Sequence, residues 1–336
     1  MLDSSAIKQY DPSKMHEVYD KWPQIAKQSY ESSSEIGDFR NIDHVVFCGM
    51  GGSGTICDMF SSILSKSDFH ICVVKGYHLP ATIDSNTLVV ASSVSGNTVE
   101  TLAVLEAASR LGCKTAAFSV GGKMREFCAK HNLPFKEIPQ FHSPRASLPS
   151  FIYPMLHYFG SMFDIKENDV LESIKSLETL QQKINSSNLN SDNTSLNLAE
   201  WLVGIPMIYY PWGLQAAAIR FKSSLQENAK IHAMAEDMME ASHNGIVSWE
   251  TPSNVQPVLI QGTEDYIKTK ERWKIFEDYF NEKKIDFYKI PSVNGNILSK
   301  LMSLIYLLDY ATIYKAFLNK TNPTPTSSIA YIKDRL

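Results

Sequence analysis

Motifs that would indicate a metal centre, a disulfide framework or a nucleotide hydrolase are missing from this sequence. Its 5 cysteines include no C-x-x-C pair, and no histidine stands at zinc-finger spacing from them. No G-x-x-x-x-G-K-[S/T] segment is present, so ATP hydrolysis has no support. We therefore expect buried free thiols in a reducing cytoplasm.

Excess charge of one sign and membrane-spanning segments are also lacking. The formal net charge is −4, with 44% hydrophobic and 20% charged residues, which is normal for a soluble globular protein. This balance gives no reason to expect nucleic acid or an anionic membrane as a partner. Charged residues interrupt the first turns, so no secretion signal is expected. The apolar region Leu301–Leu318 contains Asp309 and Lys315, which predicts a buried helix rather than a membrane span.

Short apolar segments alternate with helical patterns after a helical stretch over residues 1–36. This alternation predicts an α/β protein with parallel sheets flanked by helices. We expect a first domain over residues 37–160, a helical connection with an exposed polar loop over 161–196, and a similar second domain over 197–336. The expected strands are His44–Cys48, Ile71–Val74, Leu88–Ala91, Thr115–Phe118, Phe135–Ile138, Met207–Tyr210, Val258–Gln261 and Asp286–Ile290.

Two turns of small residues, at 48–54 and 92–101, each follow an expected strand and open a helical pattern. Helix N-termini present unpaired N–H groups and partial positive charge, so such turns suit a phosphate. The second turn adds the hydroxyls of Ser93, Ser95 and Thr98. Asn97 and Glu100 form a capping-box pattern at the start of that helix. A tight turn without a ligand is the alternative.

The first turn does not point to NAD. A dinucleotide site needs an acidic residue at the end of the next strand, to hold a ribose, and Lys75 stands there. The second half of the chain has no counterpart to Ser93-x-Ser95, so the two domains are not expected to carry equivalent sites.

The pattern Ser93-x-Ser95-Gly96-Asn97-Thr98-x-Glu100-Thr101 resembles that of SIS domains, the sugar isomerase fold that binds phosphorylated sugars. Nearly the whole chain resembles one branch in particular, the bifunctional phosphoglucose/phosphomannose isomerases. The markers of this resemblance, in chain order, are Gly49–Ser53, the turn at 93–101, Pro144–Ala146, Gln226–Lys230, His243-Asn244, and Pro323–Pro325 before a terminal helix with Lys333.

The resemblance implies interconversion of glucose 6-phosphate, and of mannose 6-phosphate, with fructose 6-phosphate, through ring opening and a cis-enediol(ate). This reaction is redox-neutral, so no metal or organic cofactor is expected. Glu227 matches the base that moves the proton between C1 and C2. His243 matches the ring-opening group, which the neighbouring subunit supplies in the family, so a homodimer is implied. Arg145 matches the residue that stabilises the enediolate.

The remaining matched positions bind substrate. Lys333 matches a lysine that reaches the ring oxygen from a terminal helix folded back over the site. We expect Ile329, Ile332 and Leu336 to form the inward face of that helix. Thr326 matches a small hydroxyl position that leaves room for the C2 epimer. The phosphate residues implied by the resemblance are Gly52, Ser53, Ser93, Ser95 and Thr98.

Three residues depart from the family pattern, and the alternatives stay open. Val94 replaces a common aromatic residue, Met239 a proline, and Gly245 an acidic residue beside His243. Taken alone, Glu227 and His243 read as ordinary surface residues. A non-catalytic sugar-phosphate sensor would keep the phosphate turn without needing both of them. An isomerase of another phosphosugar is the second alternative.

Overall fold

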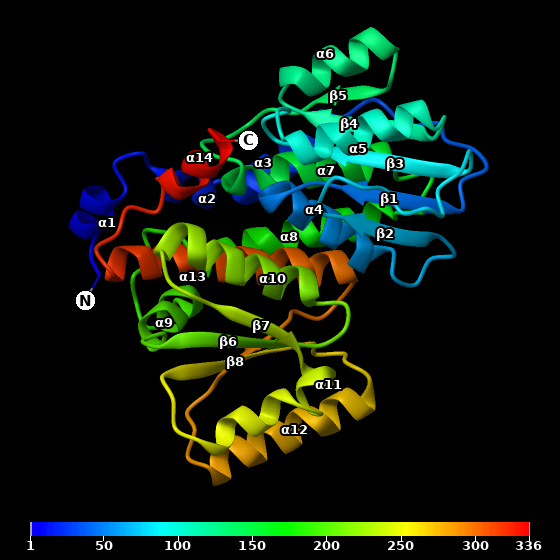
Figure 1. Cartoon of the computed structure of the whole chain (residues 1–336). Coiled ribbons are helices and arrows are strands. Elements are labelled where there is room, and N and C mark those ends of the chain that lie inside the picture. Colours follow the sequence, from blue (N-terminus) through cyan, green and yellow to red (C-terminus); the bar gives the residue numbers. More distant parts are fainter. Residues whose placement is uncertain (1, 336) are drawn as a thin grey trace. The chain divides into compact units, whose positions relative to one another are not determined.

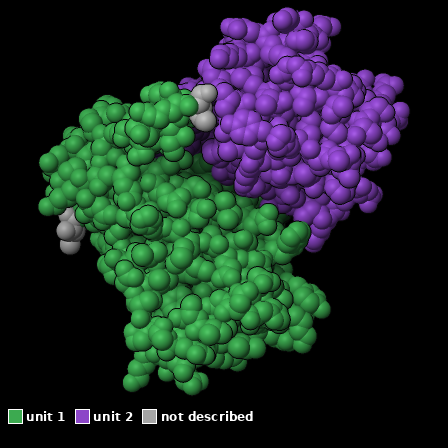
Figure 2. Space-filling model, in the orientation of Figure 1, with its two compact units in different colours: residues 1–20, 176–336 green, residues 21–175 purple. Residues whose placement is uncertain are grey.

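Two parallel sheets organise the chain in a computed structural model that describes residues 2–335 (Figure 1). The strand order is β2-β1-β3-β4-β5 in the first sheet and β7-β6-β8-β9 in the second. The chain forms two compact units, which Figure 2 colours separately. Residues 21–175 make the first-sheet unit, and residues 1–20 with 176–336 make the second-sheet unit.

The first-sheet unit contains five strands, and their paired neighbours all run parallel. The central strands β1 and β3 are buried along their whole length, as a sheet covered on both faces requires. Its strands are β1 (His44–Cys48), β2 (His70–Val74), β3 (Thr87–Ser92), β4 (Lys114–Ser119) and β5 (Phe135–Glu137). Its helices are α3 (Trp22–Glu31), α4 (Gly51–Ile63), α5 (Val99–Arg110), α6 (Gly122–His131), η1 (Arg145–Ser147) and α7 (Leu148–Tyr158), and α8 (Glu167–Ile184) leads out of the unit.

Helices cover both faces of this sheet. On one face Val46 and Val89 pack against Val104 and Leu105 of α5. On the other face Phe47 stacks on Phe60 of α4, with ring centroids 5.0 Å apart. The strands therefore present apolar side chains in both directions, and their polar turns lie at the sheet edge.

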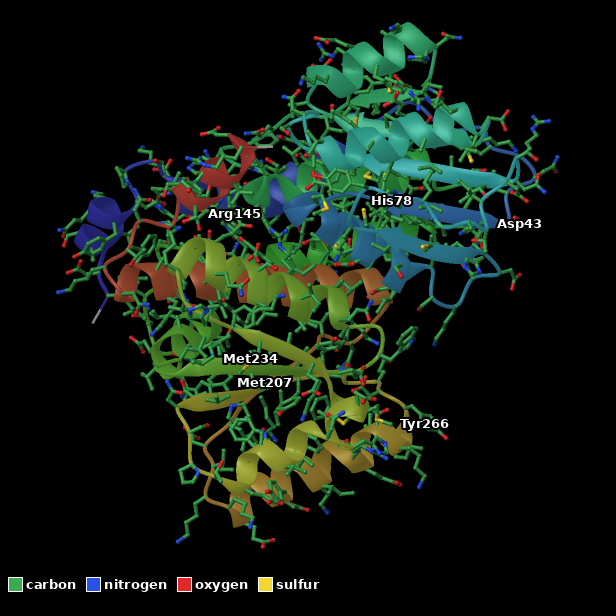
Figure 3. The ribbon with its side chains drawn as sticks, in the orientation of Figure 1. Asp43, His78, Arg145, Met207, Met234 and Tyr266 are labelled. Carbon is green, nitrogen blue, oxygen red and sulfur yellow. The ribbon has the colours of Figure 1, made fainter. Side chains whose placement is uncertain are left out.

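The second-sheet unit repeats this plan with four parallel strands. Met207 of β6 and Met234 of β7, both labelled in Figure 3, are register partners. Its strands are β6 (Ile205–Tyr210), β7 (Met234–Asp237), β8 (Val255–Gln261) and β9 (Tyr288–Pro291). Its helical elements are α1 (Ser4–Tyr10), α2 (Met15–Asp20), α9 (Thr194–Trp201), α10 (Gln215–Ser224), η2 (Leu225–Ala229), α11 (Met238–Ala241), η3 (Gly245–Glu250), α12 (Ile267–Glu282), α13 (Ile297–Leu318) and α14 (Ser327–Lys333).

The predicted fold class and all eight predicted strands are confirmed. β7 was not predicted, because Glu236 and Asp237 interrupt its apolar pattern. After β6 the helical region is two elements, since the chain passes from the α-helix α10 into the π-helical turn η2. The exposed polar loop expected up to residue 196 ends earlier, because α9 begins at Thr194 and buries Asn193 and Ser195.

α13 is the core helix that its apolar sequence predicted. It is long and apolar enough to cross a membrane by length and composition, but 89% of that window is buried inside the protein. Its Tyr306 and Tyr310 hydroxyls donate to the carbonyl of Tyr19, at 2.8 Å, and to the carboxylate of Asp20, at 2.5 Å. These bonds fasten α2 to α13 inside the second-sheet unit.

Candidate functional site

The two predicted phosphate turns lie side by side in the first-sheet unit. β1 and β3 are parallel neighbours, so the turns that follow them open at the same edge of the sheet. The backbone N–H of Val94 donates to the hydroxyl of Ser53 at 3.1 Å, which joins the two turns directly. Ser53 and Ser93 are both buried, with 4% and 1% of their surface exposed.

Two of the three hydroxyls of the second turn, those of Ser93 and Thr98, lie together. The Ser93 and Thr98 hydroxyls are 2.9 Å apart, and the N–H of Gly96 donates to Ser93 at 3.1 Å. The half-buried Ser95 instead accepts from the N–H of Asn97 at 3.2 Å. Ser93 and Thr98 thus form a hydroxyl pair next to the first turn of α5.

The predicted capping box is wrong. α5 begins after Thr98, and no side-chain hydrogen bond caps its N-terminus. The Asn97 side chain accepts from the backbone N–H of Lys123 at 3.0 Å instead, because it packs against the turn that opens α6. α4 likewise begins after Met50 without a side-chain cap. The partial positive charge of two helix N-termini therefore remains available to an anion at this edge.

Close backbone packing explains the glycines of these turns. A Cβ on Gly49 would lie 2.9 Å from the carbonyl oxygen of Ser92, so the β1–α4 turn rests on the end of β3. Gly96 has φ +67°, and a Cβ there would lie 1.9 Å from the carbonyl oxygen of Gly121. Only glycine fits at these contacts, which hold the turns in one conformation.

Arg145, labelled in Figure 3, lies at the start of η1 in the same unit as the two predicted phosphate turns. A Cβ on Gly52 would be 3.8 Å from the Cα of Arg145, so the first turn of α4 faces this segment. Arg145 is 6% exposed, unusually buried for an arginine. The Nε1 of Trp22 donates to the carbonyl of Ala146 at 2.9 Å, which ties this segment to the start of α3.

Glu227 lies in the second-sheet unit, within the π-helical turn η2. Such turns are rare and recur at functional sites. The buried guanidinium of Arg220 donates to Asp309 of α13 at 2.6 and 3.0 Å, and the Ser224 hydroxyl donates to the same carboxylate at 2.8 Å. The Asn228 amide donates to Thr312 at 2.8 Å. These bonds fasten the turn that carries the half-buried Glu227 to α13.

This buried network was not found by sequence reasoning. Arg220 follows Ala216–Ala218 in a helix that also carries Lys222, and its partner Asp309 lies 89 residues away. No local signal marks the pair, because other charged residues stand in both helices. Burial lowers the pKa of Arg220, but the carboxylate of Asp309, with a smaller contribution from Glu227, raises it above its usual value.

The C-terminal residues follow in the same unit. Thr326 is half-buried and precedes α14, and Lys333 is exposed at the end of that helix. The prediction that Ile329 and Ile332 form an inward face of α14 is wrong, since these side chains are 39% and 61% exposed. A short helix with no buried residue has no core face. Leu336, the third residue of that expected face, lies outside the described residues.

His243 is exposed and lies at the other end of β7 from Glu227. Glu227 precedes β7, and His243 follows it after α11. Its backbone N–H donates to the carbonyl of Glu240 at 2.9 Å. The structure of one chain therefore does not bring these two predicted acid–base groups together.

The second sheet has a carboxylate where the first sheet has the predicted phosphate turn at Ser93. β8 lies next to β6 in the second sheet, as β3 lies next to β1 in the first. In the turn after β8, Asp265 accepts from the N–H of Gly262 at 3.0 Å and from the Nε1 of Trp273 at 3.2 Å. The side chain of Asp265 thus binds one donor of its own turn and one of α12, so this turn is not equivalent to the Ser93 turn.

Two sheets of this order with one uncapped, hydroxyl-lined turn define an α/β protein of the SIS type. The family model described as "Bacterial phospho-glucose isomerase C-terminal SIS domain" matches residues 191–336. A bifunctional phosphoglucose/phosphomannose isomerase of Caldicellulosiruptor bescii is 33% identical over 94% of this chain and 96% of its own length. The chain belongs to this isomerase family.

More distant relatives share the fold with other named activities. A D-glucosamine-6-phosphate 4-epimerase of Sulfolobus acidocaldarius is 28% identical over 73% of this chain and 77% of its own length. The C-terminal domain of a glucosamine-fructose-6-phosphate aminotransferase from Francisella tularensis superposes with a TM-score of 0.67 at 14% identity, over 91% of this chain and 96% of that chain. The latter likeness concerns the fold alone.

Proposed function

We propose that this protein is an aldose–ketose isomerase that interconverts glucose 6-phosphate and mannose 6-phosphate with fructose 6-phosphate. The observation that carries the proposal is the pair of uncapped helix N-termini at the Ser53 and Ser93 turns, in a chain of this family. A phosphate monoester accepts hydrogen bonds from hydroxyls and backbone N–H groups and is stabilised by the helix dipoles. Gly52, Ser53, Ser93, Ser95 and Thr98 hold it.

Glu227 moves the proton between C1 and C2, and Arg145 stabilises the negative charge of the enediolate. A carboxylate held on the rigid turn η2 supports the first role, because a general base must reach one defined proton. A buried guanidinium beside the phosphate turns supports the second, since it is planar, permanently charged and shielded from solvent.

His243 and Lys333 open the sugar ring, and His243 comes from a second copy of the chain in a homodimer. The placement of Glu227 and His243 at opposite ends of β7 supports a composite site, because the two groups act on adjacent atoms of one substrate. Thr326 lies at the C2 side and leaves room for either epimer. We place this activity in the cytoplasm, in glycolysis and gluconeogenesis.

The test is turnover of fructose 6-phosphate in the presence of EDTA, with the glucose and mannose 6-phosphates resolved as products. Glu227→Gln should lower the rate on the order of 10²–10⁴-fold, because it removes the general base. Glu282→Gln, at the exposed end of α12, is the matched control and should keep wild-type activity. Binding of fructose 6-phosphate without turnover by the wild type would instead indicate a sugar-phosphate sensor.

Epimerisation of an amino sugar phosphate is the second candidate function, favoured by the similarity to the archaeal 4-epimerase. The same assay with glucosamine 6-phosphate as substrate separates the two. Turnover of glucosamine 6-phosphate without turnover of fructose 6-phosphate would replace the proposed isomerase activity.

A further inference from the structure

Lys230 ends the π-helical turn η2 in a left-handed conformation, with φ 57° and ψ 35°. Its backbone N–H donates to the carbonyl of Leu225, which closes the turn. Glycine or asparagine usually occupies such a position, because a Cβ is disfavoured there. Lys14, Lys284 and Lys320 also have positive φ, so the contacts of its side chain, rather than its backbone, distinguish Lys230.

The side chain of Lys230 reaches the segment that precedes α14. Its Nζ donates to the carbonyl oxygens of Pro325, at 2.7 Å, and Pro323, at 3.3 Å, and also to the carbonyl of Glu227. Neither proline has an N–H, so this segment has few donors for regular backbone pairing. An ammonium with three donors can bind carbonyls from two segments at once and hold them in register.

The two segments held by Lys230 carry different parts of the proposed site. Glu227 belongs to the turn that Asn228 fastens to α13. Thr326 follows Pro325 directly, and α14 then leads to Lys333. We propose that Lys230 is a positioning residue that sets Thr326 and Lys333 at a fixed distance from the base Glu227. This inference rests on the proposed function for its catalytic part and on the contacts alone for its structural part.

The charge of Lys230 also suits the end of the turn. The carbonyls at a helical C-terminus carry partial negative charge. The ammonium of Lys230 binds the carbonyl of Glu227 there together with the carbonyls of Pro323 and Pro325. A neutral side chain of similar length would keep the left-handed backbone but lose these bonds. Glycine would lose them too while relieving the backbone. Comparing the two substitutions separates the effect of losing the bonds to Pro323 and Pro325 from the effect of backbone strain at residue 230.

The experiment compares Lys230→Met, Lys230→Gly and Lys230→Arg in the full chain. Lys284 follows the C-cap of α12, has φ 56° and is exposed, so Lys284→Gly is a matched control at a similar φ. Amide hydrogen exchange over residues 326–333, kcat, KM and the ratio of mannose to glucose 6-phosphate formed are measured for each variant. Thermal unfolding reports on the fold.

We expect faster exchange over residues 326–333 in the Met and Gly variants, with kcat lowered on the order of 10- to 100-fold and KM little changed. The product ratio should shift, because Thr326 is no longer held. Lys230→Arg should restore part of kcat, and Lys284→Gly should change none of these values. The glycine variant should unfold at no lower temperature than the methionine variant.

Unchanged exchange over residues 326–333 in both Lys230→Met and Lys230→Gly would show that Lys230 does not hold the C-terminal segment. Faster exchange with unchanged kcat and product ratio would overturn its positioning role. Should the wild type turn over no sugar phosphate, the proposed function fails, while the exchange measurement still decides whether Lys230 holds the C-terminal segment.

Discussion

The hydroxyl of Ser53 accepts a 3.1 Å hydrogen bond from the backbone N–H of Val94, across two turns 41 residues apart in sequence. This bond fixes the α4 turn against the α5 turn, so the two helix N-termini proposed to bind the phosphate are held side by side. The departure from the family at Val94 leaves it intact, since the donor is the main chain.

Replacing Ser53 by alanine should destabilise the fold and weaken substrate binding together. The buried N–H of Val94 loses its partner, which costs about 1–3 kcal/mol in the free energy of unfolding. The KM for fructose 6-phosphate should rise, because one phosphate ligand is also lost. Urea unfolding and steady-state kinetics measure both effects.

Ser62→Ala is the control for that substitution. Ser62 is buried on the same helix, at 4% exposure, and its hydroxyl has no hydrogen-bond partner among residues 2–335. Its loss should leave stability and KM near the wild-type values. Equal effects of the two substitutions would show that burial, rather than the bond to Val94, accounts for the role of Ser53.

Gly96→Ala and Gly112→Ala should differ sharply in their effect on stability. Both glycines have positive φ, +67° and +71°, so both substitutions carry the backbone cost of about 1 kcal/mol or more. The added Cβ meets the carbonyl of Gly121 at 1.9 Å in the first case and nothing within 4 Å in the second. Thermal unfolding should therefore show a much larger loss of stability for Gly96→Ala, and this variant should also lose phosphate binding. Similar losses of stability in the two variants would contradict the close packing of these turns.

Local signals were sufficient to predict the sheets and two small-residue turns at the ends of neighbouring strands. The apolar runs of β1 and β3 are each bounded by small residues, and parallel strands place the turns after them at one edge. The hydroxyl pair of Ser93 and Thr98 was predictable because its spacing of five residues is a local property of one turn.

Long-range contacts decided what the sequence could not predict. Asn97 has every local property of an N-cap, yet it binds Lys123 because α6 packs beside it. Arg220 and Asp309 meet across two helices, and no local pattern marks that pair. The apolar residues of α14 predict a buried face, but burial depends on what lies opposite, which the pattern does not contain.

Breaking the buried ion pair in the second-sheet unit should be far more costly than breaking an exposed one. The side chains of Arg220 and Asp309 are 3% and 0% exposed, so Asp309→Asn leaves a buried positive charge without its counter-ion. We expect a loss of about 3–5 kcal/mol in the free energy of unfolding. Glu106→Gln breaks the pair with Arg110, whose side chain is 76% exposed, and should cost at most about 1 kcal/mol.

Urea unfolding of both variants measures the difference. Because Asp309 anchors the turn of Glu227, the Asn variant should also lose kcat under conditions where it remains folded. Wild-type kcat in folded Asp309→Asn would mean that the network stabilises the fold without positioning the base.

Subunit mixing distinguishes a composite site from one built within a single chain. Glu227→Gln and His243→Ala homodimers should each be almost inactive. If His243 acts on the site of the neighbouring chain, a mixed dimer of the two variants has one site with both wild-type groups. Random pairing in a two-fold dimer then restores about a quarter of the wild-type sites.

The double variant Glu227→Gln/His243→Ala provides the reverse measurement. Mixed in equal amount with wild type, it forms dimers in which each site lacks one group, so only the wild-type homodimers stay active. Activity should fall to about a quarter of that of an equal total amount of wild-type protein, whereas sites contained in one chain would leave about half. A value of one half, with no recovery in the first mixture although the chains exchange, would place His243 in the site of its own chain and overturn the composite site.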